Sequence, residues 1–445
     1  MNVRKLSCGL ASLAVYVCVS LSPWGDAAHA EQKETPPNII LIMADDVGYE
    51  CFGCYGSEQY STPNIDQLAT QGMRFDHCYS QPLCTPTRVK LMTGLTNARN
   101  YSAFSVLTRD QKTIGQHFKN GGYDTAVVGK WQLFGAKHYS KQFRARGTMP
   151  NAAGFDHVCL WQVDQLGERY PGPLMWIDGE NRQFGSEAFG PDVATDYLID
   201  FIQSPRDRPF FAYYPMILPH SPFVPTPHSE NPKSKDRQRN FEDMVAYVDH
   251  LVGKIAQAVD DVGLTQQTMI IFTGDNGTGR QIQSKLNGTT IQGGKGLTTD
   301  AGTHVPLVIS WPGTVPPGST CDDLVDCSDF LPTVLEAASL DSEYQLDGQS
   351  FLPQLKGRPG TPREWLFCYY CPRPEKTPPA RFARTKQFKL YGDGRFFDIP
   401  ADRLEKTPLQ VDSLSSEQRT AFQLLSEVLE TMPDKGETLL EFPTQ

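Results

Sequence analysis

The sequence lacks an internal repeat, a low-complexity tract and, beyond its N-terminus, any hydrophobic run long enough to span a membrane. It also lacks an excess of basic charge, because its 445 residues carry a formal net charge of -10 at pH 7. That balance argues against a surface that binds nucleic acid or an anionic membrane. With 39% hydrophobic and 21% charged residues, the composition is that of an ordinary globular protein. An acidic protein can still hold an anionic substrate, but only in a local cationic pocket.

The N-terminus has the pattern of a secretory signal peptide. Arg4 and Lys5 precede an apolar run over residues 10–21, and Ala28-His29-Ala30 matches the small-x-small cleavage pattern. A membrane anchor is the alternative, but the run is short and its exit contains proline and glycine. We therefore expect residues 1–30 to be removed and the protein to be exported, to the periplasm or outside the cell, without stable membrane insertion.

The cysteine count is odd after export. Of the 11 cysteines, Cys8 and Cys18 leave with the signal peptide, so nine remain. An odd count in an exported protein indicates one cysteine outside the disulfides, and we take this to be Cys84. The pairs Cys321–Cys327 and Cys368–Cys371 are candidate disulfides, although spacing alone does not fix the connectivity.

Strand-length apolar runs alternate with helical patterns over most of the chain. Residues 38–43 are continuously apolar, which is typical of a strand buried on both faces of a parallel sheet. Thr62 and Pro63 then have the residue types of a helix cap and first turn, and Gly72 ends that helix. Further apolar runs lie at 125–128, 210–216, 269–272 and 305–311, with an amphipathic helix over 241–259. We predict an α/β fold with a large, mostly parallel sheet sandwiched by helices.

The composition changes near residue 360. Aromatic and basic residues dominate, and Gly392-Asp393-Gly394 separates two short strand-like runs at 388–391 and 395–398. A helix is predicted over 417–432. We therefore expect a catalytic α/β domain over 36–358 and a small C-terminal subdomain over 359–445, consisting of an antiparallel sheet with a terminal helix.

A cysteine motif is the first candidate for chemistry. Cys84-Thr85-Pro86-Thr87-Arg88 places a thiol before a helix that should begin at Pro86, in the positive field of the helix N-terminus. Arg88 adds a cation one turn later. The alternative is a structural cysteine in a loop.

Acidic and amide side chains follow two of the predicted strands. Asp45-Asp46 and Asp275-Asn276 supply hard oxygen ligands, which suit Ca²⁺ or Mg²⁺ better than zinc. The alternatives are ordinary turns. Asn276-Gly277-Thr278 also matches a glycosylation acceptor, a role incompatible with metal binding by Asn276.

Three cationic candidates lie next to glycines or prolines: Lys130 after Gly129, Lys295 between two glycines, and His220 after Pro219. Such lysines can reach an anionic group that the backbone approaches closely. Each lysine is equally compatible with a solvated surface position, and His220 with a structural loop.

Taken together and in this order, the segments resemble the sulfatase family of the alkaline-phosphatase-like superfamily, over roughly residues 36–400. The resemblance is carried by Ala44-Asp45-Asp46, Thr62-Pro63-Asn64, Cys84 to Arg88 with Thr93-Gly94, Gly129-Lys130-Trp131, His220, Gly274 to Gly277, Gly294-Lys295, Val305-Pro306-Leu307, Leu324-Val325-Asp326 and Asp329 to Thr333. The ordered set is far more specific than any one piece.

The resemblance implies a mechanism. A maturase would oxidise Cys84 to formylglycine, whose hydrated aldehyde attacks sulfur and then expels sulfate, which a plain serine could not do. Asp45, Asp46, Asp275, Asn276 and the modified Cys84 would hold Ca²⁺, with Mg²⁺ as the alternative. Lys130 and Lys295 would neutralise the sulfate oxygens, Arg88 would orient the diol, and His220 would bind sulfate or protonate the leaving oxygen.

Three positions depart from the family pattern. Gln132 stands where the family usually has histidine, and an amide can hydrogen-bond the diol but cannot shuttle a proton. His304 ends the stretch from Asp300 that replaces an acidic-Gly-Gly-x-Arg motif; it either supplies the missing imidazole or shapes the substrate pocket. Thr87 replaces serine but keeps the hydroxyl, so modification of Cys84 should survive.

The resulting hypothesis is an exported, metal-dependent sulfatase that acts on a sulfated carbohydrate or another sulfate ester. One alternative is a phosphodiester or phosphonate hydrolase on the same scaffold. Another is a sulfatase-like glycan-binding protein that has lost turnover through Gln132.

Overall fold

The computed structural model describes residues 1–2, 36–374 and 376–436, and contacts group the described residues from Pro36 onward into one compact unit. Most of the predicted signal peptide, residues 3–30, lies outside the described residues. Within the described residues, no helix combines the length and apolar character needed to cross a bilayer. The predicted boundary at residues 358 and 359 stays a prediction.

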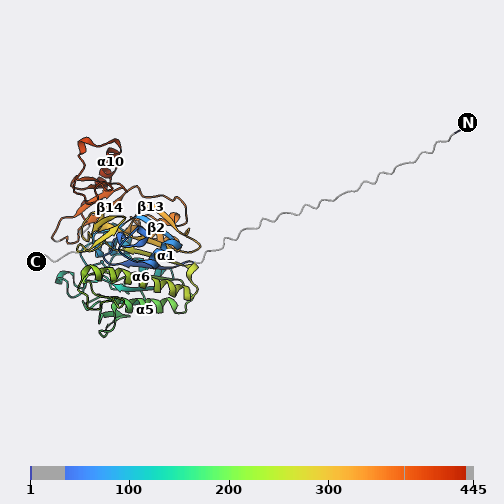
Figure 1. Cartoon of the computed structure of the whole chain (residues 1–445), viewed down its shortest axis with the longest axis vertical. Helices are drawn as coiled ribbons and strands as arrows, with labels where there is room; N and C mark the ends of the chain where they lie inside the picture. Colours follow the sequence, from blue (N-terminus) through green and yellow to red (C-terminus); the bar gives the residue numbers. More distant parts are fainter. Residues whose placement is uncertain (3–35, 375, 437–445) are drawn as a thin grey trace. The chain divides into compact units, whose positions relative to one another are not determined.

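An eleven-stranded mixed sheet forms the centre of the molecule (Figure 1). The strand β1 (Asn38–Ala44) pairs in parallel with β7 (Phe210–Pro215) and β8 (Thr268–Gly274). Parallel pairing continues from β7 through β3 (Asp124–Lys130) to β4 (His157–Trp161). Beyond β4 lie β5 (Leu174–Ile177) and β6 (Glu180–Gln183). Beyond β8 lie β12 (Leu307–Ser310) and then β2 (Met73–Tyr79). Two further strands, β11 (His304–Val305) and β13 (Ser319–Asp326), pair with β2. The predicted α/β class is confirmed.

Helices cover both faces of this sheet, which explains why every residue of β1 is buried. Side chains alternate along a strand, so Leu41 packs in one hydrophobic core and Ile42 in another. The first core includes residues of α2 (Cys84–Thr93), α4 (Ile114–Asn120) and α8 (Phe330–Ala337). The second includes residues of α1 (Pro63–Gln71), α5 (Gly190–Gln203) and α6 (Arg237–Asp261).

Two local predictions were wrong in detail. Thr62 occupies the residue before α1, but its hydroxyl does not cap the helix; it donates to Asp66 Oδ1 at 3.1 Å and accepts from the Gly53 amide. The apolar run over 305–311 is two strands, β11 and β12, separated at Pro306. Proline has no N–H to continue the ladder.

The C-terminal region is the predicted antiparallel sheet with a helix. Its strands are β14 (Leu366–Tyr370), β15 (Ala380–Arg384), β16 (Phe388–Tyr391) and β17 (Phe396–Asp398). The helix α10 (Ser416–Thr431) contacts β15 and β16, and a capping box between Ser415 and Gln418 starts it. A separate hairpin consists of β9 (Gln283–Leu286) and β10 (Thr289–Gln292).

The two candidate disulfides, Cys321–Cys327 and Cys368–Cys371, do not form. Cys321, Cys327 and Cys368 are thiols. Cys321 lies in β13 and Cys327 just beyond it, so an extended strand separates them by about 20 Å, far above the ~7 Å limit for bridged Cα atoms. Cys368 lies in extended β14 and donates to Gln81 Oε1 at 3.1 Å, while Cys371 donates to the Thr377 carbonyl at 3.4 Å. The odd cysteine count therefore does not single out Cys84.

Leu425 of α10 has 0% exposure in the core between this helix and the small sheet. We expect Leu425→Ala to lower the free energy of unfolding by about 2–5 kcal/mol, because it leaves a cavity in that core. Denaturant unfolding measures the change, with Gln423→Ala on the exposed face of α10 as the control. Equal stability of the two variants would contradict the packing described for α10.

Candidate functional site

Polar side chains converge where neighbouring parallel strands end. Asp45 and Asp46 follow β1, and Asp275 follows β8. Lys130 is the last residue of β3, and His220 lies in the segment after β7. Because the carboxyl ends of parallel strands share one edge of the sheet, residues far apart in sequence meet there.

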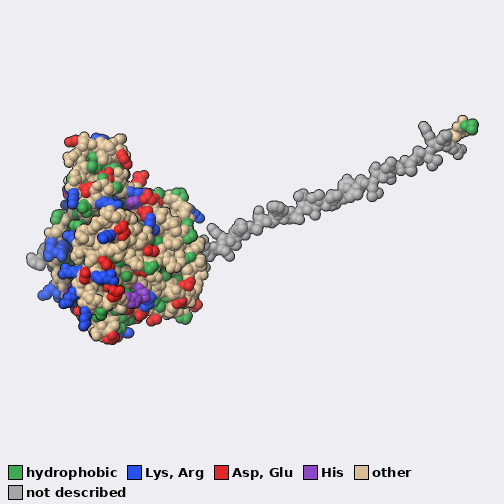
Figure 2. Space-filling model, in the orientation of Figure 1, with side chains coloured by type: hydrophobic (Ala, Val, Ile, Leu, Met, Phe, Trp, Pro, Cys, Tyr) green, Lys and Arg blue, Asp and Glu red, His purple; other side chains and the backbone are tan. Residues whose placement is uncertain are grey.

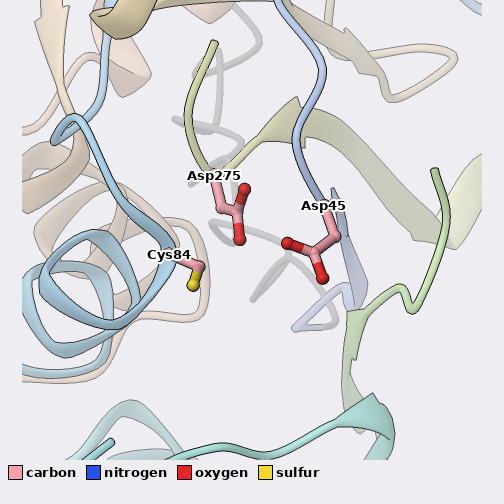
Figure 3. Close-up of side chains that lie close together, drawn as sticks. All are labelled: Asp45, Cys84 and Asp275. Atoms are coloured by element: carbon pink, nitrogen blue, oxygen red, sulfur yellow. The ribbon is translucent and has the colours of Figure 1, made fainter. Parts of the chain in front are cut away.

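Cys84 reaches this edge from the start of α2. The helix begins at Cys84 itself, two residues earlier than predicted, and the thiol is 1% exposed. Ligand atoms of Asp45, Cys84 and Asp275 all lie within 4.8 Å of one another. Figure 3 shows the three side chains facing a common space from three different elements.

Two buried cations compensate the carboxylates. The Arg88 guanidinium donates to Asp275 Oδ2 at 2.9 and 3.2 Å and to the Lys130 carbonyl at 2.9 Å. Lys130 Nζ donates to Asp45 Oδ2 at 2.7 Å. The four side chains are at most 1% exposed, so removing one partner would leave an uncompensated buried charge.

Asp46 has its own set of partners. Lys295 Nζ donates to Asp46 Oδ2, and His220 Nε2 lies 3.6 Å from the same oxygen. The Asp46 amide donates to Asp275 Oδ1 at 3.1 Å. The backbone at Asp46 has a φ of 68°, a left-handed conformation that is uncommon outside glycine and recurs at functional sites.

The pKa directions follow from this crowding. Burial opposes ionisation of Asp45, but Lys130, His220 and Arg88 outweigh it and lower the pKa of its carboxyl. Burial and the neighbouring Asp45 charge raise the pKa of Asp275 despite Arg88. Burial lowers the pKa of His220 to about 4 and raises the pKa of the Cys84 thiol. The cations therefore stabilise the charged form of Asp45, whereas the charge of Asp275 is incompletely compensated.

Two buried oxygens make the site suited to a divalent cation. Asp45 Oδ1 and Asn276 Oδ1 have no hydrogen-bond partner among the described residues. The Asn276 Nδ2 instead donates to Asp46 Oδ1 at 2.9 Å. Unpartnered buried oxygens are costly, and carboxylate and amide oxygens are the ligands that Ca²⁺ and Mg²⁺ prefer. Asn276 is fully buried, which excludes the glycosylation alternative at this residue.

Gln132 contacts Cys84, whereas His304 contacts Tyr49 and Asp76. Cys84 Sγ donates to Gln132 Oε1 at 3.1 Å. The His304 ring instead stacks on Tyr49 at 3.8 Å, and its Nε2 lies 2.9 Å from the Asp76 carbonyl. His304 also lines a cavity of about 500 Å³, together with Asp76 and His77.

Sequence reasoning missed three side chains at the site. Arg169 lies 2.8 Å from His220 Nδ1, with its guanidinium over the Trp161 ring. Tyr139 accepts a hydrogen bond from Gln132, and Gln162 contacts the same hydroxyl. The sequence held a signal for one of them, because the dipeptide Trp-Gln occurs directly after β3, at residues 131–132, and across the end of β4, at residues 161–162.

Comparisons with family models, with related sequences and with solved structures show what this chain is similar to. Residues 37–340 match the family model described as Sulfatase, and residues 294–428 match the model described as N-sulphoglucosamine sulphohydrolase, C-terminal. Arylsulfatase A from Homo sapiens is 32% identical over 397 residues, covering 80% of this chain and 75% of that protein. N-acetylgalactosamine-6-sulfatase from Canis lupus familiaris is 30% identical, covering 75% of this chain and 68% of that protein. The structure of Ps i-CgsB in complex with k-i-k-neocarrahexaose superposes with a TM-score of 0.74 at 25% identity, over 92% of this chain and 96% of that one.

We expect chelation of divalent cations to lower the Tm and added Ca²⁺ or Mg²⁺ to restore it, because the ion would bind only the folded site. When the free ion is present at 100 times its Kd, binding raises the free energy of unfolding by about 2.7 kcal/mol. Thermal unfolding with each ion separately also identifies the preferred one. Asp46→Asn should abolish the response, whereas Asp322→Asn, whose side chain is 70% exposed, should keep it. Equal responses in both variants would rule out a site at Asp46.

Proposed function

The chain belongs to the sulfatase family and hydrolyses sulfate esters, and from this premise we propose that its substrate is a sulfated carbohydrate and its nucleophile a formylglycine at position 84. The observation that carries the proposal is the convergence of Cys84 with Asp45 and Asp275 at the start of α2. We further propose that the protein is exported and that a formylglycine-generating maturase acts on it.

The hydrated aldehyde supplies one hydroxyl to attack sulfur and a second to release the resulting ester. The surrounding side chains then have separate roles in this reaction. Arg88, which donates to Asp275, would orient the diol at position 84. Lys130 and Lys295 offset negative charge on the sulfate oxygens. His220, 19% exposed, donates to the sulfate or to the leaving oxygen.

The metal would be held by Asp45, Asp46, Asp275 and Asn276, with the modified residue 84 as a further ligand. We propose Ca²⁺, with Mg²⁺ as the alternative, because all the donors are hard oxygens. When bound, the ion supplies Lewis acidity toward a sulfate oxygen.

A basic loop between Asp124 and Asp156 is evidence for a polyanionic substrate. Between Asp124 and Asp156 the chain has five lysine and arginine residues and no acid, although the whole protein is acidic. Lys137, Lys141, Arg144 and Arg146 are exposed there, and Tyr139 of the same loop contacts Gln132 beside Cys84. Figure 2 likewise shows lysine and arginine gathered on part of an otherwise mixed surface. Such a local field attracts a chain with several negative groups.

Coexpression with a maturase should convert Cys84 to formylglycine and give sulfate release from sulfated oligosaccharides. Peptide mass spectrometry detects the replacement of the thiol by an aldehyde, and ion chromatography detects sulfate. Cys84→Ala should abolish turnover, and Cys84→Ser should stop at a sulfated serine. An unmodified Cys84 with no sulfate release would favour the glycan-binding alternative. Turnover of phosphodiesters alone would favour the phosphodiester hydrolase.

Neutralising the basic loop should weaken recognition of a multiply sulfated oligosaccharide. We expect Lys141→Gln with Arg144→Gln to lower kcat/KM for it on the order of tenfold at low salt, and added salt to remove the difference. Turnover of a small monosulfated aryl ester should not change. Lys233→Gln, at another exposed lysine, is the control. A loss that is equal for both substrates would contradict this role of the loop.

A further inference from the structure

We propose that Tyr139 and Gln162 are positioning residues that hold the amide of Gln132 with its carbonyl oxygen toward position 84. The inference rests on the proposed function for its kinetic consequence, but its geometry stands independently. Gln132 is one of the three positions at which this chain departs from the family pattern.

The two glutamines leave the sheet side by side. Lys130 and Trp161 pair at the ends of β3 and β4. Just beyond them, the backbone N–H of Gln132 donates to the backbone carbonyl of Gln162 at 3.3 Å. Gln132 has a φ of 52° and Gln162 a φ of 61°. This left-handed backbone is uncommon for glutamine and persists only where the surroundings fix it.

Both amide groups meet on one hydroxyl. Gln132 Nε2 donates to the Tyr139 hydroxyl at 3.0 Å, and Gln162 Nε2 donates to it at 2.9 Å. Gln162 Nε2 also lies 3.2 Å from His138 Nε2. An amide nitrogen only donates and a phenolic oxygen can accept twice, so the NH₂ groups of both glutamines are directed toward Tyr139.

The opposite end of the Gln132 amide faces the nucleophile. Its Oε1 accepts from Cys84 Sγ at 3.1 Å, and this sulfur stands in for a hydroxyl of the hydrated aldehyde, which is also a donor. The carbonyl therefore orients the hydroxyl hydrogen and leaves the hydroxyl lone pair available for sulfur. If the amide turned over, its NH₂ would donate to the hydroxyl and occupy that lone pair.

The kinetic test is a double-mutant cycle on the mature enzyme. Tyr139→Phe should lower kcat about 5- to 10-fold with KM unchanged, as expected for one lost hydrogen bond. In a Gln132→Ala background the same change should have almost no effect. Equal losses in both backgrounds would overturn the proposal, because they would show that Tyr139 acts independently of Gln132.

Tyr123→Phe is the matched control. The Tyr123 hydroxyl is buried and has no hydrogen-bond partner among the described residues, so its loss should leave kcat unchanged. A drop in kcat equal to that of Tyr139→Phe would attribute the effect to the loss of any buried hydroxyl and would overturn the proposal.

A second measurement does not require sulfatase activity. In protein labelled with ¹⁵N-glutamine, the Gln132 side-chain resonance is assigned by its loss in Gln132→Ala. Its NH₂ should exchange with water about tenfold faster in Tyr139→Phe, and at the wild-type rate in Tyr123→Phe. Unchanged exchange in Tyr139→Phe would overturn the positioning role. Faster exchange in a protein that releases no sulfate would instead retain the positioning role and reject the proposed function.

Discussion

The balance of buried charge at the carboxyl edge of the sheet is the constraint on which the site depends. Asp45 and Asp275 are fully buried, and Lys130 and Arg88 are the cations that contact them. Since Arg88 also donates to the Lys130 carbonyl, one side chain ties α2 to the ends of β8 and β3. Charge compensation and the placement of Cys84 are therefore the same structural requirement.

This requirement explains why α2 has no solvent-exposed face. All ten of its residues are buried, including Arg88 and Lys90. Lys90 donates to Asp326 at 2.7 Å, at the end of β13, so the helix is held by an ion pair on a second side. A helix without a solvent face is fixed along its length, and its first residue is fixed with it.

Much of the architecture could be predicted because it depends on local pattern. The run from Ile39 to Met43 is apolar throughout, and strand ends in such sheets share an edge, so the convergence of Asp45 with Asp275 follows. Other features depend on tertiary contacts that no local pattern encodes. Thr62 has a capping residue type but finds a better partner in Asp66, and Tyr139 reaches Gln132 only through the path of its loop. The disulfide predictions failed because residue spacing ignores that extended strands hold close cysteines apart.

The cysteines have a further consequence. Six of the cysteines are buried thiols: Cys51, Cys78, Cys159, Cys321, Cys327 and Cys368. Within the part of the chain that the structure describes, these six thiols close no covalent loop and contribute no loop-closure entropy to stability. A reductant should therefore leave these six residues unchanged, and burial rather than cross-linking keeps their sulfur atoms from reacting.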